Sequence, residues 1–121
     1  MRARDAGRLI HTSSGHGVTG RADRSAYVAS KFGLEGFHES LARELADTGV
    51  DSMTIRPPGG GLCTERATRY GRDPDSFTHD DPTVVAEAAV QLAEAGGENG
   101  GRYRATPDGD GFVTYSRADG D

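Results

Sequence analysis

The sequence predicts an α/β fold in which short strands alternate with long helices. Residues 8–13 have an apolar centre between polar ends and read as a short strand. Apolar residues at three- and four-residue spacing then predict a helix from about residue 25 to residue 48. Residues 50–56 alternate in a way that favours a second strand, and a second helix follows from residue 82.

The first helix is expected to begin near Asp23 or Ser25. The apolar residues that form its stripe are Leu34, Phe37, Leu41 and Leu45. Gly49 follows the last turn and is interpreted as its C-terminal cap. Gly33 and Gly36 lie in the helix interior, where glycine costs about 1 kcal/mol relative to alanine. We therefore expect this helix to pack closely against a sheet or another helix.

The C-terminal half is predicted to contain one helix and short strands. The helix starts with the N-cap sequence Asp81-Pro82-Thr83 and ends at Gly96-Gly97. Residues 103–105 and 111–115 read as short strands around a Pro-Asp-Gly-Asp turn. Residues 65–81 are polar without a clear period and read as a surface loop, and residues 116–121 read as an acidic tail.

Ser14, Tyr27 and Lys31 have a spacing that suits proton transfer. Residues four apart on a helix share one face and are about 6 Å apart along the axis, so Lys31 can act on the Tyr27 phenol. A free tyrosine has a pKa near 10, which must fall by roughly 3 units for proton exchange at neutral pH; a neighbouring ammonium supplies part of that shift. A serine hydroxyl beside the pair can hold a carbonyl or alcohol oxygen.

The same segment resembles the catalytic segment of the short-chain dehydrogenase/reductase family. Ser14 is followed by twelve residues and then by Tyr-Val-Ala-Ser-Lys, and both flanking sequences also resemble the family. The similarity runs from Gly7 to about Gly59 and continues more weakly to Tyr103. It implies the C-terminal part of a Rossmann-like doubly wound parallel sheet, with about three strands and two to three helices.

The resemblance implies an NAD(P)-dependent oxidoreductase that transfers a hydride between a nicotinamide cofactor and a small alcohol or carbonyl substrate. Tyr27 would exchange the proton with the substrate oxygen, and Ser14, or alternatively Ser13, would orient that oxygen. Lys31 would lower the tyrosine pKa and hold the nicotinamide ribose. The substrate, the direction of the reaction and the choice between NAD and NADP stay open.

The family's Pro-Gly turn and downstream threonine, which approach the nicotinamide, are matched imperfectly. If Pro57 is the family's proline, its glycine is replaced by Pro58; if Pro58 is, then Thr64 comes one residue late. The cofactor-binding residues that the resemblance implies are Tyr27, Lys31, Pro58, Gly59 and Thr64.

Several parts of a complete family member are not found in this sequence. The glycine-rich pyrophosphate turn, the residues that select NAD or NADP, and the asparagine of the family's catalytic tetrad have no counterpart. Gly15 and Gly17 lack the third glycine of a dinucleotide fingerprint. We therefore expect the N-terminal cofactor-binding half to be absent and Met1 to be an internal methionine of a longer protein.

Residues 1–121 are thus expected to form one incomplete Rossmann-like domain. Its predicted parts are a catalytic strand-helix-strand unit at 7–60, a lid-like loop at 61–81, a helix and strand at 82–115 and a tail at 116–121. With its neighbour missing, the strand before Ser14 would present an open edge, so poor solubility is expected. The alternative function is a non-catalytic remnant that acts as an oligomerisation or interaction module.

Composition excludes several other classes of function. The net charge is −5, with 14 basic and 19 acidic residues, which argues against a nucleic-acid partner. No apolar run approaches the roughly 18 residues of a membrane span, and no signal peptide is visible, so a cytoplasmic protein is expected. The resemblance also implies that the protein forms a homo-oligomer through the helix at 25–48.

The cysteine and histidine residues do not predict a metal centre. Cys63 is the single cysteine, so an internal disulfide is excluded. The histidines are His11, His16, His38 and His79. Their spacing does not match a metal-binding motif, so surface or structural roles are expected for them.

Overall fold

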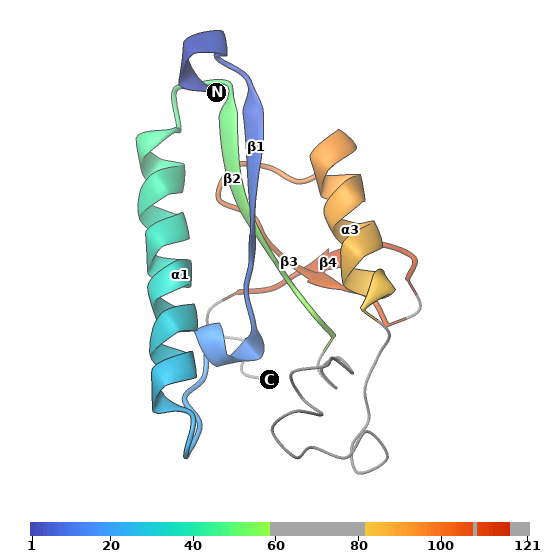
Figure 1. The fold of residues 1–121 in the computed structure, drawn as a ribbon. Helices are drawn as coiled ribbons and strands as arrows, with labels where there is room; N and C mark the ends of the chain where they lie inside the picture. The colour runs from blue at the N-terminus through green and yellow to red at the C-terminus, as the bar shows by residue number, and fades with distance from the viewer. Residues whose placement is uncertain (59–81, 108, 117–121) are drawn as a thin grey trace.

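The described residues form an open sheet with one helix on each face (Figure 1). The computed structural model describes residues 1–58, 82–107 and 109–116. In chain order the elements are the short 3₁₀ helix η1 (Arg2–Arg4), β1 (Gly7–Thr12), the 3₁₀ turn η2 (Gly15–Gly17), α1 (Ser25–Glu44), β2 (Val50–Arg56), α3 (Thr83–Glu94), β3 (Arg102–Ala105) and β4 (Phe112–Thr114). The predicted α/β class is confirmed.

The strand order in the sheet is β1-β2-β3-β4. β1 and β2 are parallel, with Gly7 opposite Val50 and Thr12 opposite Ile55. β2 and β3 are also parallel, whereas β3 and β4 pair antiparallel. The two short strands predicted around the Pro-Asp-Gly-Asp turn are therefore a hairpin that extends a parallel sheet. Parallel neighbours connected through helices are typical of a doubly wound sheet.

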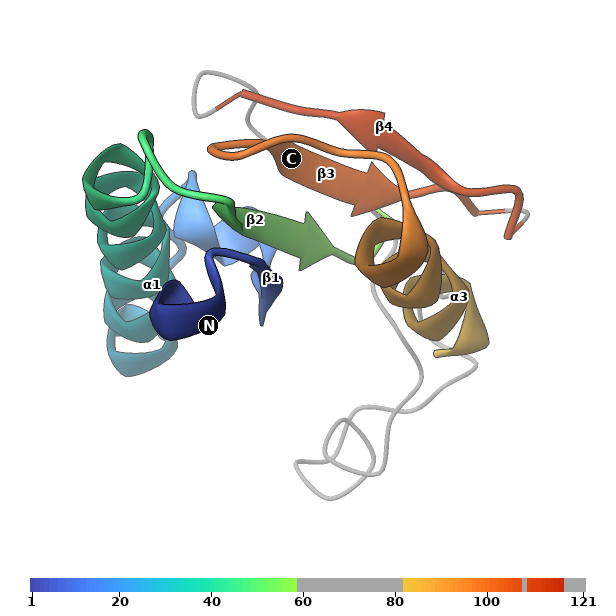
Figure 2. The ribbon, with the colours of Figure 1, turned by 90° about the horizontal axis from the view of Figure 1, so that it is seen from above.

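Helices α1 and α3 cover opposite faces of the sheet, as the view from above shows (Figure 2). The alternation along β2 explains the difference between the two faces. On the α3 side, Met53 and Ile55 join a buried apolar cluster with Ala88, Leu92 and Tyr103. On the α1 side, β2 presents a different kind of surface. Its buried residues there are the polar side chains Ser52, Thr54 and Arg56.

The buried face of α1 matches the predicted apolar stripe only in part. Leu45 at its C-terminal end is buried and Leu34 and Leu41 are half-buried, whereas Phe37 is 55% exposed. The buried residues within the helix are Glu35, His38 and Ala42. A methyl group added at Gly33 or Gly36 would meet no atom within 4 Å. Within the described part of the chain, these glycines therefore do not mark close packing against another element. Polar residues of α1 face the sheet because β2 offers them polar partners there.

The ends of the helices agree with the sequence only in part. α3 ends before Gly96 and Gly97, which have φ angles of 89° and 71° and match their predicted role. α1 ends at Glu44, earlier than predicted, and Gly49 does not cap it. Instead, the Gly49 amide donates to the Asp5 carboxylate at 2.8 Å, and a side chain at Gly49 would collide with the Asp5 backbone.

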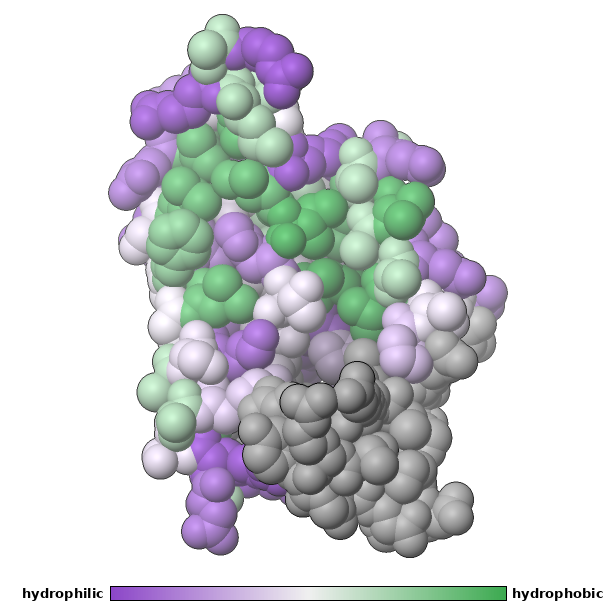
Figure 3. Space-filling view, in the orientation of Figure 1, coloured by the Kyte–Doolittle hydropathy of each residue, from purple (hydrophilic) through white to green (hydrophobic). Residues whose placement is uncertain are grey.

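An apolar surface extends from α1 across β1 toward α3 on the face shown in Figure 3. Among the described residues, β1 pairs with β2 on one side and has no sheet neighbour on the other. Phe37 lies next to this strand, with its ring in edge contact with that of His11 at 5.8 Å between centroids. An exposed strand edge beside an exposed aromatic residue favours association.

We predict that the isolated 121-residue chain self-associates through this surface. Phe37→Gln should weaken the association, while Val113→Gln, on β4 at the other end of the sheet order, should leave it unchanged. Sedimentation velocity between about 1 and 100 μM measures the effect. A wild-type chain that stays monomeric throughout and unfolds in one two-state transition would contradict the prediction.

Candidate functional site

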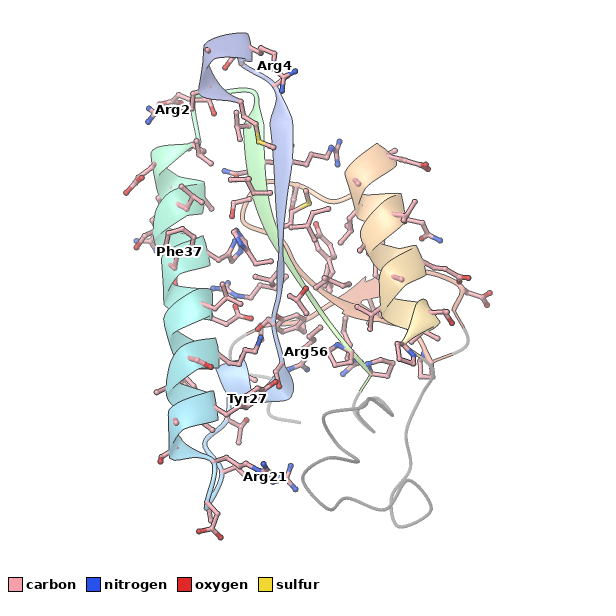
Figure 4. The ribbon with its side chains drawn as sticks, in the orientation of Figure 1. Arg2, Arg4, Arg21, Tyr27, Phe37 and Arg56 are labelled. Carbon is pink, nitrogen blue, oxygen red and sulfur yellow. The ribbon has the colours of Figure 1, made fainter. Side chains whose placement is uncertain are left out.

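The predicted catalytic residues lie at the carboxyl edge of the sheet. Ser14 is the second residue after β1, and β2, parallel to β1, ends at Arg56 on the same edge. Tyr27 is in the first turn of α1, at the end of that helix nearest this edge (Figure 4). Open α/β sheets bind their ligands at the carboxyl ends of their strands. The fold therefore brings the segment after β1, which carries Ser14, and helix α1, which carries Tyr27 and Lys31, to the place where a ligand is expected.

Tyr27 and Lys31 are brought together on one face of α1. The Lys31 Nζ atom lies 5.7 Å from the centroid of the Tyr27 ring and donates a hydrogen bond to the Thr12 carbonyl at 3.0 Å. This hydrogen bond fixes the ammonium between the phenol and the end of β1. Ser14, Tyr27 and Lys31 are all half-buried. The arrangement supplies a hydroxyl donor, a phenol and a cation around one strand end.

The two adjacent serines have different environments. The Ser13 side chain is buried and donates a hydrogen bond of 2.6 Å to Glu35 Oε1, and its backbone amide donates to the Ile55 carbonyl at 2.7 Å. Ser14 is half-buried at the strand end. Because the Ser13 hydroxyl is engaged in the protein interior, this geometry favours Ser14 over Ser13 as the serine that contacts a substrate.

The predicted cofactor contacts beyond α1 are described only in part. Pro58 is buried just after the end of β2, at the carboxyl edge. Gly59 and Thr64 lie outside the described residues, as does Asp81, the predicted N-cap of α3. The predicted lid-like loop at 61–81 also falls outside them.

Glu35 is a buried carboxylate that the sequence reasoning missed. Its side chain is fully buried and accepts hydrogen bonds from Ser13 Oγ and the Tyr115 hydroxyl, both at 2.6 Å, and from Arg102 Nε at 2.8 Å. Burial raises the pKa of Glu35, but the three hydrogen bonds and the Arg102 charge outweigh it and lower the pKa below its ordinary value. Its position four residues after Lys31, on the face that carries Tyr27, is the signal that could have identified it.

Tyr115 links Glu35 to the end of β2. Its hydroxyl donates to Glu35 and lies 3.0 Å from Thr54 Oγ1, and the Arg56 guanidinium lies over its ring at 4.1 Å from the centroid. Burial and the hydrogen bond to Glu35 raise the pKa of Tyr115 to about 12, so it remains a donor at neutral pH. A cation on an aromatic face is favourable, so the ring helps to hold Arg56 at the carboxyl edge.

His11 and His38 share the hydroxyl of Ser52. Ser52 Oγ lies 3.0 Å from His11 Nε2 and 2.9 Å from His38 Nδ1. Burial lowers the pKa of both histidines and outweighs the effects that raise it, which are the hydrogen bond with the Gly100 backbone and the Glu35 charge for His38, and the Glu35 charge for His11. Their hydrogen bonds to Ser52 make the two histidines polar partners within the α1–sheet interface.

Across the described ranges no group of three metal-ligating side chains is found, and none of the helices there has the length and apolar character of a membrane span.

We predict that the α1–sheet interface loses stability as the pH falls from about 7.5 to 5.5. Both histidines have folded-state pKa values below the ordinary 6.5, so the unfolded chain binds more protons in this range and protonation favours unfolding. The Glu35 contribution is still present there, because its pKa is lowered from 4.5 and its protonation begins at lower pH.

Thermal unfolding midpoints across this pH range test the prediction. His38→Gln should reduce the pH dependence. Asn99→Ala is the matched control, since it removes hydrogen bonds to Ala42 and Ser52 in the same interface but no titratable group. It should keep the wild-type pH dependence. Equal pH dependence in the wild type and His38→Gln would contradict the assignment.

Comparison with known proteins places this geometry in context. A family model described as short chain dehydrogenase matches residues 1–73. The chain is 46% identical over 57 residues to a D-beta-hydroxybutyrate dehydrogenase from Cupriavidus necator; this match covers 47% of the chain and 22% of that protein. It is 36% identical over 101 residues to a 3-oxoacyl-[acyl-carrier-protein] reductase from Vibrio harveyi; this match covers 77% of the chain and 41% of that protein.

The solved structures agree on the fold. An actinorhodin polyketide ketoreductase with NADPH superposes with a TM-score of 0.69 at 23% identity, over 89% of this chain and 49% of that one. At this identity the match supports the fold alone. The chain spans less than half the length of each of these three proteins.

Proposed function

Because this chain belongs to the short-chain dehydrogenase family, we propose that it takes part in hydride transfer between a nicotinamide cofactor and an alcohol or carbonyl substrate. Ser14, Tyr27 and Lys31 are the proposed catalytic residues. The observation that carries this proposal is the position of the Lys31 ammonium, which is held by the Thr12 carbonyl 5.7 Å from the centre of the Tyr27 ring.

The proposed roles follow from the chemistry of these side chains. In the reducing direction the Tyr27 hydroxyl gives its proton to the carbonyl oxygen of the substrate, and the Lys31 ammonium stabilises the phenolate that remains. The Ser14 hydroxyl donates a hydrogen bond that holds the same oxygen in place. In the oxidising direction the phenolate takes the proton back. A bound nicotinamide supplies or accepts the hydride at the adjacent carbon.

The donor set at the carboxyl edge fits the ribose of a nicotinamide cofactor. Lys31 presents an ammonium and Tyr27 a hydroxyl on one helix face, and both are half-buried. Such donors suit the vicinal hydroxyls of a ribose. Pro58, Gly59 and Thr64 are proposed to complete the contacts near the nicotinamide. The proposal covers both NAD and NADP.

The names of the relatives suggest the type of substrate. One relative is named for a hydroxybutyrate and another for a 3-oxoacyl group, so both names describe an oxygen on an acyl chain. We therefore propose a small alcohol or carbonyl compound of this type as the substrate.

A second function is favoured by the exposed surface beside β1. Phe37 is 55% exposed on α1, next to a strand that has one sheet neighbour among the described residues. This surface fits an oligomerisation or interaction module that does no chemistry. The two proposals differ in one property: the enzyme binds a nicotinamide nucleotide, and the module does not.

We predict that Tyr27→Phe lowers turnover by at least about 100-fold, since it removes the proton donor and leaves the ring packing in place. Turnover is followed by NAD(P)H absorbance with 3-oxo and 3-hydroxy acids. Tyr103→Phe is the matched control, because Tyr103 lies on β3 and its hydroxyl accepts a hydrogen bond from the Glu98 amide, outside the proposed catalytic residues. It should keep turnover within about twofold of the wild type.

Fluorescence titration with NADH and NADPH separates the two functions. Micromolar binding by the 121-residue chain favours the enzyme. If the chain binds neither nucleotide and forms a stable complex with another protein chain through the surface around Phe37, the module is favoured. Turnover that survives Tyr27→Phe would contradict the assignment of this residue as the proton donor.

A further inference from the structure

The segment that carries Ser14 is anchored on Glu35 from both sides. Before Ser14, the Ser13 hydroxyl donates to Glu35 Oε1 at 2.6 Å. After Ser14, Gly17 packs so closely on α1 that a methyl group there would lie 2.9 Å from Glu35 Cγ and from Ser13 Oγ, and 3.2 Å from the Lys31 carbonyl. The Gly17 amide also donates to the Ser14 carbonyl at 2.8 Å, so the segment is a tight turn against the helix.

Glu35 lies on the same face of α1 as Tyr27 and Lys31, the two proposed catalytic residues of that helix. Tyr27, Lys31 and Glu35 follow one another at four-residue spacing, so one rigid helix carries all three. A contact between Glu35 and the serine segment therefore sets the position of Ser14 relative to Tyr27 and Lys31. Without it, the serine segment keeps its connection to β1 and the packing of Gly17 on α1 but loses a buried hydrogen bond to the helix.

The other two partners of Glu35 come from the C-terminal hairpin. Arg102 in β3 donates at 2.8 Å, and Tyr115, just after β4, donates at 2.6 Å. Arg102 also lies 3.6 Å from Glu39, one turn further along α1. Both carboxylate oxygens of Glu35 are thus engaged, and the side chain is fully buried. Glu35 is therefore unsuited to exchange protons with a substrate and suited to hold three parts of the fold together.

We propose that Glu35 is a positioning residue that holds the Ser14 segment in register with Tyr27 and Lys31 and couples it to β3 and β4. This inference rests on the proposed function for its effect on catalysis. Its structural content, that Glu35 and Ser13 together fix the serine segment, holds independently of any chemistry.

Two variants test the anchor at different points. Ser13→Ala removes one hydrogen bond and leaves Arg102 and Tyr115 paired with Glu35. Glu35→Gln keeps the size of the side chain but removes its charge and places an amide group among donors. Because a buried network can fail to fold when its central residue changes, Ser13→Ala is the milder variant that keeps the test decisive. Asn99→Ala is the control, because it removes the hydrogen bond from the Asn99 amide group to the Ala42 carbonyl at the other end of α1.

The first readout is amide hydrogen exchange in the serine segment. The amides of Gly17, Val18 and Thr19 donate within this turn to the carbonyls of Ser14 and Gly15. In Ser13→Ala and Glu35→Gln these amides should exchange at least about tenfold faster relative to the β2 amides other than that of Ser52, which donates to Asn99 and is left out of the reference. In Asn99→Ala the ratio should not change. An unchanged ratio in both test variants would overturn the proposal.

The second readout is steady-state kinetics with the same substrates and cofactors. A misplaced Ser14 should lower kcat by about tenfold or more while KM and the Kd for NAD(P)H stay within about twofold. The double variant Ser13→Ala/Glu35→Gln should have a kcat no lower than that of Glu35→Gln alone, because both substitutions break the same anchor. Faster exchange with an unchanged kcat would overturn the catalytic part. If the wild type has no turnover, the proposed function fails, and the exchange ratio alone decides whether Glu35 is the anchor.

Discussion

The arrangement of this site depends on a buried carboxylate at Glu35 and its three hydrogen-bond donors. Removing a charge from water is costly unless hydrogen bonds and an opposite charge replace the lost hydration. These replacements come from Ser13 just after β1, Arg102 in β3 and Tyr115 just after β4. Because no subset of the donors would satisfy the carboxylate equally well, the helix, the serine segment and the hairpin are held together at one point.

The two faces of β2 explain why polar contacts hold α1 in place. Met53 and Ile55 take part in the apolar cluster under α3, whereas Ser52 and Thr54 lie under α1. The contacts of α1 with the sheet are therefore directional, as in the short distance between His38 and Ser52. Directional contacts fix the rotation and translation of a helix more sharply than apolar packing does. This suits a helix whose first turns carry the proposed reacting groups.

Local patterns in the sequence predicted the α/β class, β2 and the shared face of Tyr27 and Lys31. They could not predict the buried face of α1. The partners of Glu35 on the hairpin lie 67 and 80 residues away in the chain, so no local period shows that a glutamate is buried while Phe37 is exposed. The apolar stripe predicted the burial of Leu45 but not that of Glu35 and His38, because the sheet presents polar side chains to these two residues.

Glu35 is ionised inside the protein and accepts hydrogen bonds from all three donors. A ¹³C NMR titration of its side-chain carboxyl group is the sharpest test of this state. We expect the pKa of Glu35 to lie below the ordinary glutamate value of 4.5 and to rise in Ser13→Ala. A carboxyl group that titrates at or above the ordinary value, and is unaffected by Ser13→Ala, would show that Glu35 does not hold these donors as a carboxylate.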